Sequence, residues 1–315
     1  MALCPEDHLR RFCEYYLDQG AARIHVYHDG PPDFATNDPR IAMTICDDAF
    51  WQDLDMERPF GVEERQRCVY RQAYARCHAT WLLIVDIDEY VFGPAPLDTL
   101  LGTVDDKSDC VRFTSAEAVY CASDAVTCEF GASLFRLPME RHFSPLLARL
   151  IYGIRGGLFT RGLLGHSRGK QAVRSGNAAL VIDIHDAGIS ASETIRFDAT
   201  EHCGFHLAHY DAISFQCWAA KCADRLSRGD AQEMGRKREH QLQLFAACRS
   251  EDEREHLFRR LYALSPWQAR LLERLGLLVK RPRALEDQGG RPIGSFADQA
   301  LRSSPDLTIG QKLDA

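Results

Sequence analysis

The chain has 315 residues, of which 45% are hydrophobic and 26% charged, and its formal net charge is −7. This composition provides enough apolar material for a core and excludes a disordered, collagen-like or coiled-coil chain. A net acidic chain repels the phosphate backbone, so we expect no nucleic-acid partner. No stretch approaches the roughly 20 consecutive apolar residues of a membrane-spanning helix, and the first residues do not resemble a signal peptide. We therefore expect a cytoplasmic protein.

The 12 cysteines include no C-x-x-C pair, which argues against a zinc ribbon and against a thioredoxin-like site. Most of them lie in segments with apolar periodicity, where a free cysteine behaves as a small hydrophobic residue. We expect reduced thiols with a structural role.

The first ninety residues alternate between helical and extended patterns. Apolar side chains recur at helical spacing from Leu9 to Leu17, and Gly20 suits the end of this first helix. The elements predicted after it are strands at 23–28 and 41–46, a helix at 62–78 and a strand at 81–85. The last strand is continuously apolar, as expected for a strand covered on both faces. This alternation is typical of an α/β fold with a mixed sheet flanked by helices.

The second part of the chain is predicted to be largely helical. Strands are expected at 110–114 and 179–184, and a loop at 153–176, which contains seven glycines, four arginines and little apolar periodicity. Further on, helices are predicted at 213–226, 233–248, 253–264 and 267–278, followed by a weakly structured tail at 281–315.

Three acids, Asp86, Asp88 and Glu89, directly follow the apolar strand at 81–85. Ligands bind at the carboxyl ends of strands in open α/β sheets, and alternation along an extended backbone puts Asp86 and Asp88 on the same side. Two carboxylates suit Mg²⁺ or Mn²⁺, which prefer oxygen ligands and keep positions free for substrate phosphates. The simpler alternative is that these acids cap the next helix or face water.

Two histidines are candidates for a further ligand of such an ion. His185 follows the predicted strand at 179–184, and His209 lies in a run with His202 and His206. A zinc protease would need H-E-x-x-H, which is absent, and buried histidines with satisfied hydrogen bonds are the simpler alternative. A strand end presents a ligand rigidly, so we favour His185 over His209, which we expect at the head of a helix.

A basic segment interrupts this acidic chain. Lys170 and Arg174 lie in it, close to His166 and Arg168. Such a group of cations suits an anionic ligand such as a diphosphate. The segment lacks the full P-loop pattern, which excludes a P-loop NTPase, and a solvated loop is the alternative interpretation.

Together these segments resemble the GT-A glycosyltransferases of the family 2-like and family 92-like group. The resemblance covers roughly residues 1–225 and rests on a helix–strand unit, a D-x-D-E motif, a histidine after a strand, a G-K-x-x-x-R segment and a histidine–tyrosine segment. The matching positions are residues 6–20, 25–30 and 66–90, His185, Gly169, Lys170, Arg174, His209, Tyr210, Ser214, Trp218 and Lys221.

The resemblance implies a GT-A fold and metal-dependent transfer of a sugar from a nucleoside-diphosphate sugar, above all a UDP-sugar, to a saccharide, a lipid-linked acceptor or a small molecule. An inverting reaction also needs a carboxylate that deprotonates the acceptor, for which Glu117 and Glu140 are candidates by position alone. The other implied roles are metal binding for Asp86 and Asp88, nucleotide or diphosphate binding for Asp29, Gln66, Asp86, Lys170 and Arg174, and support for Glu89, Tyr210 and Lys221.

The resemblance also suggests a division of the chain: a GT-A domain at 1–225, a helical extension at 226–280 and the tail at 281–315. Between residues 254 and 283 cations outnumber acids, so peripheral contact with an anionic membrane is an alternative to packing as a helical cap. The alternative function is a non-catalytic sugar-nucleotide or glycan-binding protein. The nearly complete acidic motif argues against it, since a binding protein needs no metal pair.

Overall fold

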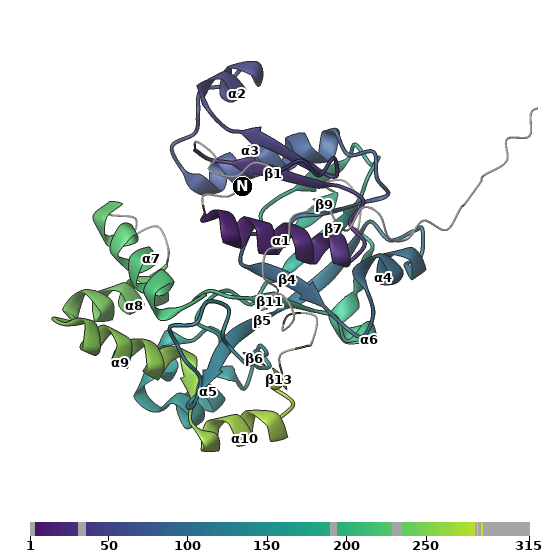
Figure 1. Ribbon diagram of the computed structural model, residues 1–315. Coiled ribbons are helices and arrows are strands. Elements are labelled where there is room, and N and C mark those ends of the chain that lie inside the picture. The colour runs from purple at the N-terminus through teal and green to yellow at the C-terminus, as the bar shows by residue number, and fades with distance from the viewer. Residues whose placement is uncertain are drawn as a thin grey trace, which may run out of the picture.

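Strand β5 (Cys110–Cys121) is the longest strand and organises the sheet of this protein. The computed structural model describes residues 4–30, 36–189, 194–228, 235–280, 282 and 285 as a mixed α/β molecule with helices packed around the sheet (Figure 1). The α/β class predicted from the sequence is confirmed.

The helices and strands have the following bounds. The helices are α1 (Glu6–Asp18), α2 (Asp48–Asp53), α3 (Val62–Ala75), α4 (Leu97–Thr103), α5 (Ser144–Tyr152), the 3-10 helix η1 (Gly153–Leu158), α6 (Ala199–Cys203), α7 (Phe215–Arg228), α8 (Arg236–Ala247), α9 (Glu251–Tyr262) and α10 (Pro266–Arg274). The strands besides β5 are β1 (Ile24–His28), β2 (Ile41–Ile45), β3 (Trp81–Leu83), β4 (Glu89–Phe92), β6 (Leu134–Arg136), β7 (Lys170–Arg174), β8 (Leu180–Ile182), β9 (Ala187–Ile189), β10 (Arg196–Asp198), β11 (His206–His209), β12 (Ala263–Leu264) and β13 (Leu278–Lys280).

Successive parts of β5 pair with different strands. Its first residues pair antiparallel with β7 and parallel with β10, its middle pairs parallel with β11 and antiparallel with β6, and its end pairs with β12. Strand β3 is added beyond β7, and β4 beyond β11. The acidic segment between β3 and β4 therefore connects two sides of the sheet. Strands β1 and β2 form a separate parallel pair, and β8 and β9 form a hairpin.

The N-terminal elements form as their sequence patterns predict. Helix α1 carries Glu6 and Asp7 in its first turn, where acids favour the positive end of the helix dipole. It buries Leu9, Cys13 and Tyr16 on one face. Gly20 follows with a φ of +88°, a conformation that favours glycine. The predicted strands at 23–28 and 41–46 and the predicted helix at 62–78 correspond to β1, β2 and α3.

Three expectations about the middle of the chain are wrong. The predicted loop at 153–176 contains η1 and β7, and β7 is an inner strand of the sheet. Strand β3 is only half-buried because it pairs with β7 alone. His209 ends strand β11 rather than beginning a helix.

The C-terminal helices pack on the same core as the sheet. Phe245, Phe258 and Tyr262 are buried in the main hydrophobic cluster together with residues of α1, β5 and α7. The segment also adds β12 and β13 to the sheet, which the sequence analysis did not predict. The predicted tail at 281–315 lies outside the described residues, apart from Pro282 and Leu285. All twelve cysteines are free thiols, and none of the described helices is long and apolar enough to cross a bilayer.

Candidate metal and nucleotide site

The acidic motif forms the tight turn between β3 and β4. The Glu89 amide donates to the Asp86 carbonyl (3.0 Å), and the Asp86 amide donates to Oε2 of Glu89 (2.8 Å). Glu89 is fully buried, whereas the side chains of Asp86 and Asp88 keep 28% and 17% of their surface exposed. Glu89 thus holds the turn, and the two aspartates on it remain partly exposed to solvent.

Asp86 lies at the centre of a group of side chains from α3 and β7. Lys170 donates to its Oδ2 (2.8 Å), while Gln66 and Tyr70, one turn apart on α3, donate to its Oδ1 (3.3 Å each). Burial would raise the pKa of Asp86, but the adjacent ammonium of Lys170 lowers it to about 2. Burial raises the pKa of Glu89 to about 7. Lys170 itself is 1% exposed and lies 3.6 Å from Oε2 of Glu89.

Asp88 faces the end of β11 and the first turns of α7. Pairing of β11 with β4 sets His209 opposite Glu89, and Nε2 of His209 lies 4.0 Å from Oδ2 of Asp88. The Tyr210 amide donates to the Asp88 carbonyl (2.9 Å), and Nζ of Lys221 lies 3.7 Å from Oδ2 of Asp88. The predicted supporting residues Tyr210 and Lys221 are therefore next to the acidic turn.

Three histidine rings gather beside this turn. The ring centroid of His166 lies 3.9 Å from that of His185 and 5.6 Å from that of His209. Burial and the two neighbouring imidazoles lower the pKa of His166 to about 3, and burial and Lys170 lower that of His185 to about 4. Among the described residues, the buried Nδ1 atoms of His166 and His185 have no hydrogen-bond partner. The lowered pKa values keep the imidazoles of His166 and His185 neutral at pH 7.

His166 was not selected as a site residue from the sequence. The sequence places His166 only in the basic segment before Lys170. No local pattern predicts that this segment forms a strand of the sheet. The structure brings it to His209 because the loop before it is anchored by Glu117.

Glu117 lies in the middle of β5 and is 1% exposed. Its Oε1 accepts from Nε of Arg136 (2.8 Å), from a second Arg136 nitrogen and from the Leu164 amide (3.1 Å), while Oε2 accepts from the Gly165 amide (2.7 Å). Both oxygens are thus occupied by protein groups. The geometry makes Glu117 a positioning residue for the loop that carries His166, and it does not fit an acceptor base.

Glu140, the other candidate base, lies exposed in the turn before α5. Among the described residues its side chain has no hydrogen bond or ion pair with the acidic turn or with the three histidines. The structure does not bring Glu140 to the cluster.

Two predicted nucleotide-binding residues lie apart from the acidic turn. Asp29, directly after β1, forms ion pairs with Arg58 (2.9 Å) and Arg65 (3.2 Å), and Arg65 precedes Gln66 on α3. Arg174 faces the other end of β3, where it is in register with Trp81 and its guanidinium lies 4.2 Å from the centroid of that ring. The expectation that Arg174 joins Lys170 at a diphosphate is not supported by this placement.

The sequence analysis also missed Asp211, which connects the site to the C-terminal helices. Asp211 is 4% exposed and accepts from Arg238 of α8 (3.0 and 3.1 Å) and from Tyr262 of α9 (2.5 Å). Burial alone would raise its pKa, but the charges of Arg238 and Lys221 hold it well below the ordinary value. Lys221 lies 3.6 Å from Oδ1 of Asp211, so its ammonium is shared between Asp211 and Asp88.

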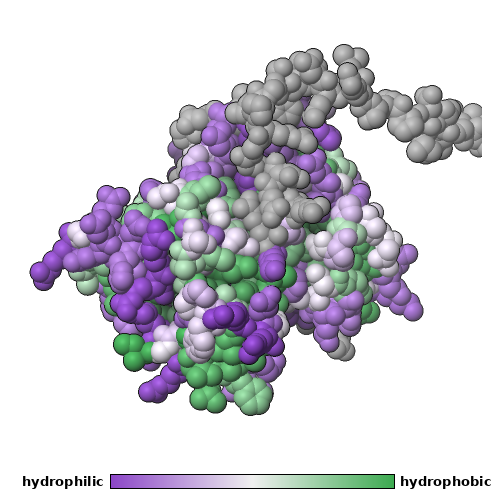
Figure 2. Space-filling model, turned by 60° about the horizontal axis from the view of Figure 1, so that its bottom comes forward, coloured by the Kyte–Doolittle hydropathy of each residue, from purple (hydrophilic) through white to green (hydrophobic). Residues whose placement is uncertain are grey.

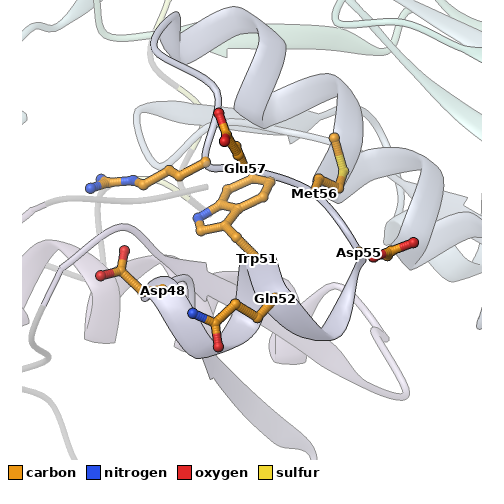
Figure 3. Close-up of a pocket in the computed structure, with 7 residues that line it drawn as sticks. Asp48, Trp51, Gln52, Asp55, Met56 and Glu57 are labelled. Carbon is orange, nitrogen blue, oxygen red and sulfur yellow. The ribbon is translucent and has the colours of Figure 1, made fainter.

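The described residues include a second group of potential ligand atoms and a surface hollow. His8, Glu129 and Cys217 form the only group of three whose ligand atoms lie within 4.8 Å of one another in the described part of the chain. A surface hollow of about 460 Å³ lies beside α2 (Figure 3). The hollow is lined by Asp48, Trp51, Gln52, Asp55, Met56, Glu57 and Arg58.

Comparison with protein-family models, curated proteins and solved structures finds no match to this chain. The donor atoms of the site are of the types that Mg²⁺ or Mn²⁺ accepts: carboxylate oxygens of the partly exposed Asp86 and Asp88, and the imidazole of His209 beside Asp88. Lys170 provides a positive charge that Asp86 and Glu89 share.

Proposed function

We propose that this α/β protein is a metal-dependent glycosyltransferase of the GT-A type. It would transfer a sugar from a nucleoside-diphosphate sugar, above all a UDP-sugar, to a saccharide or lipid-linked acceptor. The observation that carries the proposal is the turn between β3 and β4, which sets two partly exposed aspartates beside a buried lysine and three histidines. Carboxylates at a strand end, with cations and imidazoles nearby, are suited to a divalent ion and a diphosphate.

Asp86, Asp88 and His209 are the residues we propose as metal ligands. The sequence favours His185 as the third ligand. In the structure Nε2 of His209 lies 4.0 Å from Oδ2 of Asp88, so we propose His209 for this role instead. A bound Mg²⁺ or Mn²⁺ would offset the negative charge that develops on a leaving diphosphate.

The chain's own residues would bind and orient the donor. Lys170, held between Asp86 and Glu89, keeps a fixed positive charge at the turn, where it attracts phosphate oxygens. The unpartnered Nδ1 atoms of His166 and His185 offer hydrogen bonds to phosphate or sugar oxygens. Asp29 pairs with Arg65 of α3, and the next residue, Gln66, donates to Asp86. Asp29 therefore remains our candidate for binding the nucleoside part of the donor.

The test is hydrolysis of UDP-sugars without an acceptor, measured with Mn²⁺ and with a chelator. We expect release of UDP that depends on Mn²⁺ and falls at least tenfold in Asp88→Asn. Asp106→Asn is the matched control, because the Asp106 side chain is fully exposed and pairs with Arg174, which faces the end of β3 away from the acidic turn. UDP binding without any turnover would favour the non-catalytic sugar-nucleotide-binding protein, and the absence of both would reject the proposal.

A further inference from the structure

Helix α5 exposes an unusual set of large apolar side chains. Leu146 and Leu150 follow Phe143 at helical spacing on one face, while Ala148 and Ile151 are buried on the other. The exposed fractions are 62% for Phe143, 71% for Leu146, 59% for Leu150 and 95% for Ile154, just after the helix.

This apolar surface continues onto α10. The side-chain amide of Gln268 donates to the Ile151 carbonyl (2.9 Å), which holds the two helices side by side. Trp267 on α10 and Leu275, directly after the helix, are also exposed, at 51% and 45%. In Figure 2, which brings the bottom of Figure 1 forward, hydrophobic side chains lie at the surface next to strongly hydrophilic ones. We call this the α5–α10 surface, composed of Phe143, Leu146, Leu150, Ile154, Trp267 and Leu275.

The charges around the α5–α10 surface are positive, although the whole chain is acidic. Residues 140–160 contain Arg141, Arg149 and Arg155 and one acid, Glu140, and residues 259–280 contain five cations and one acid. Burial and the charge of Arg260 both lower the pKa of Arg155, so cations from the two segments lie close together. The chain as a whole has a net charge of −7, so this excess of cations around the α5–α10 surface points to an anionic partner.

We propose that the α5–α10 surface binds an anionic lipid bilayer. Exposed Phe, Leu and Ile side chains on a short helix, a tryptophan beside them and arginines at the border are the features of a helix that lies in the membrane interface. Arginines attract anionic headgroups, whereas a second copy of this chain would bring the same positive charges against each other. The proposal does not depend on the reaction, although it would bring a lipid-linked acceptor to the protein.

The test is co-sedimentation of the full chain with vesicles of phosphatidylcholine, alone or mixed with phosphatidylglycerol. We expect binding to the anionic vesicles that weakens with salt and with loss of phosphatidylglycerol. The double variant Leu146→Glu, Leu150→Glu should bind at least about tenfold more weakly, because each leucine transfers its apolar surface to the interface. Phe60→Glu is the matched control, since Phe60 is 98% exposed and lies before α3.

Charge is tested with a second matched pair. Arg149→Glu should weaken vesicle binding, whereas Arg71→Glu, at an exposed position of α3, should not. Failure of the wild-type chain to bind at low salt would overturn the proposal, and so would equal binding by the double variant. Sedimentation velocity tests whether a second copy of the chain binds this surface instead. If the wild-type chain is a dimer and the double variant Leu146→Glu, Leu150→Glu is a monomer, the surface is a dimer interface and the proposal is wrong.

Discussion

The geometry of the candidate site depends on charged side chains that are almost fully buried. Glu117, Arg136 and Lys170 are each about 1% exposed. An isolated buried charge is strongly destabilising, so each of these groups needs an opposite charge in direct contact. Glu117 and Arg136 provide this for each other, and Asp86 and Glu89 provide it for Lys170. Ion pairs with Lys170 therefore hold the acidic turn, and amide hydrogen bonds to the paired Glu117 hold the loop with His166.

Glu117→Gln is expected to lower the free energy of unfolding by about 3–5 kcal/mol, because it leaves the Arg136 guanidinium buried without a counter-charge. Urea unfolding of the two proteins measures this difference. In the variant Glu117→Leu, Arg136→Met neither charge remains, so part of the loss should be recovered, while the Leu164 and Gly165 amides still lack their acceptor. A Glu117→Gln protein with wild-type stability and abolished turnover would contradict the positioning role and restore Glu117 as a candidate base.

At the scale of single elements, β7 determines where Lys170 lies. Gly169, immediately before the strand, has a φ of +74° and passes so close to β5 that an added Cβ would lie 1.9 Å from the Phe113 carbonyl oxygen. Only glycine fits both the backbone conformation and the space. The entry of β7 into the sheet, and with it the place of Lys170 beside Asp86, thus depends on this residue.

Gly169→Ala is expected to destabilise the protein by more than about 3 kcal/mol, since it adds a backbone clash to an unfavourable φ. Gly176→Ala is the matched control: Gly176 has a φ of +87° but open space around it, so only about 1 kcal/mol should be lost. Thermal or urea unfolding compares the two variants. Equal losses would show that the approach of β7 to β5 is not as close as described.

The sequence predicts elements well where the apolar pattern alone decides them, as in α1 and α3. It does not predict β7, because this strand buries a lysine and a glutamine whose partners come from distant segments. The same limit applies to His209, whose strand is defined by pairing with β4 and β5. The acidic turn was found because three acids after an apolar run are a local signal, whereas His166 and Asp211 join it only through the tertiary fold.

On the scale of the whole molecule, the proposed functions occupy separate regions. The acidic turn and its histidines lie where β3, β4, β7 and β11 meet, whereas the α5–α10 surface is formed by helices at the lower end of the view in Figure 1. The two regions are connected in sequence, because the loop that follows η1 leads to His166. Variants of the α5–α10 surface are therefore expected to leave the acidic turn intact.

The most direct test of the central claim is calorimetric titration of the chain with Mn²⁺ in the presence of UDP. We expect one ion to bind, with at least tenfold lower affinity in Asp88→Asn and in His209→Gln and with unchanged affinity in Asp106→Asn. Cys217→Ser reports on the separate His8–Glu129–Cys217 group, and it should bind Mn²⁺ as the wild type does. Unchanged affinity in Asp88→Asn, or loss of binding in Cys217→Ser alone, would contradict a metal site at the acidic turn.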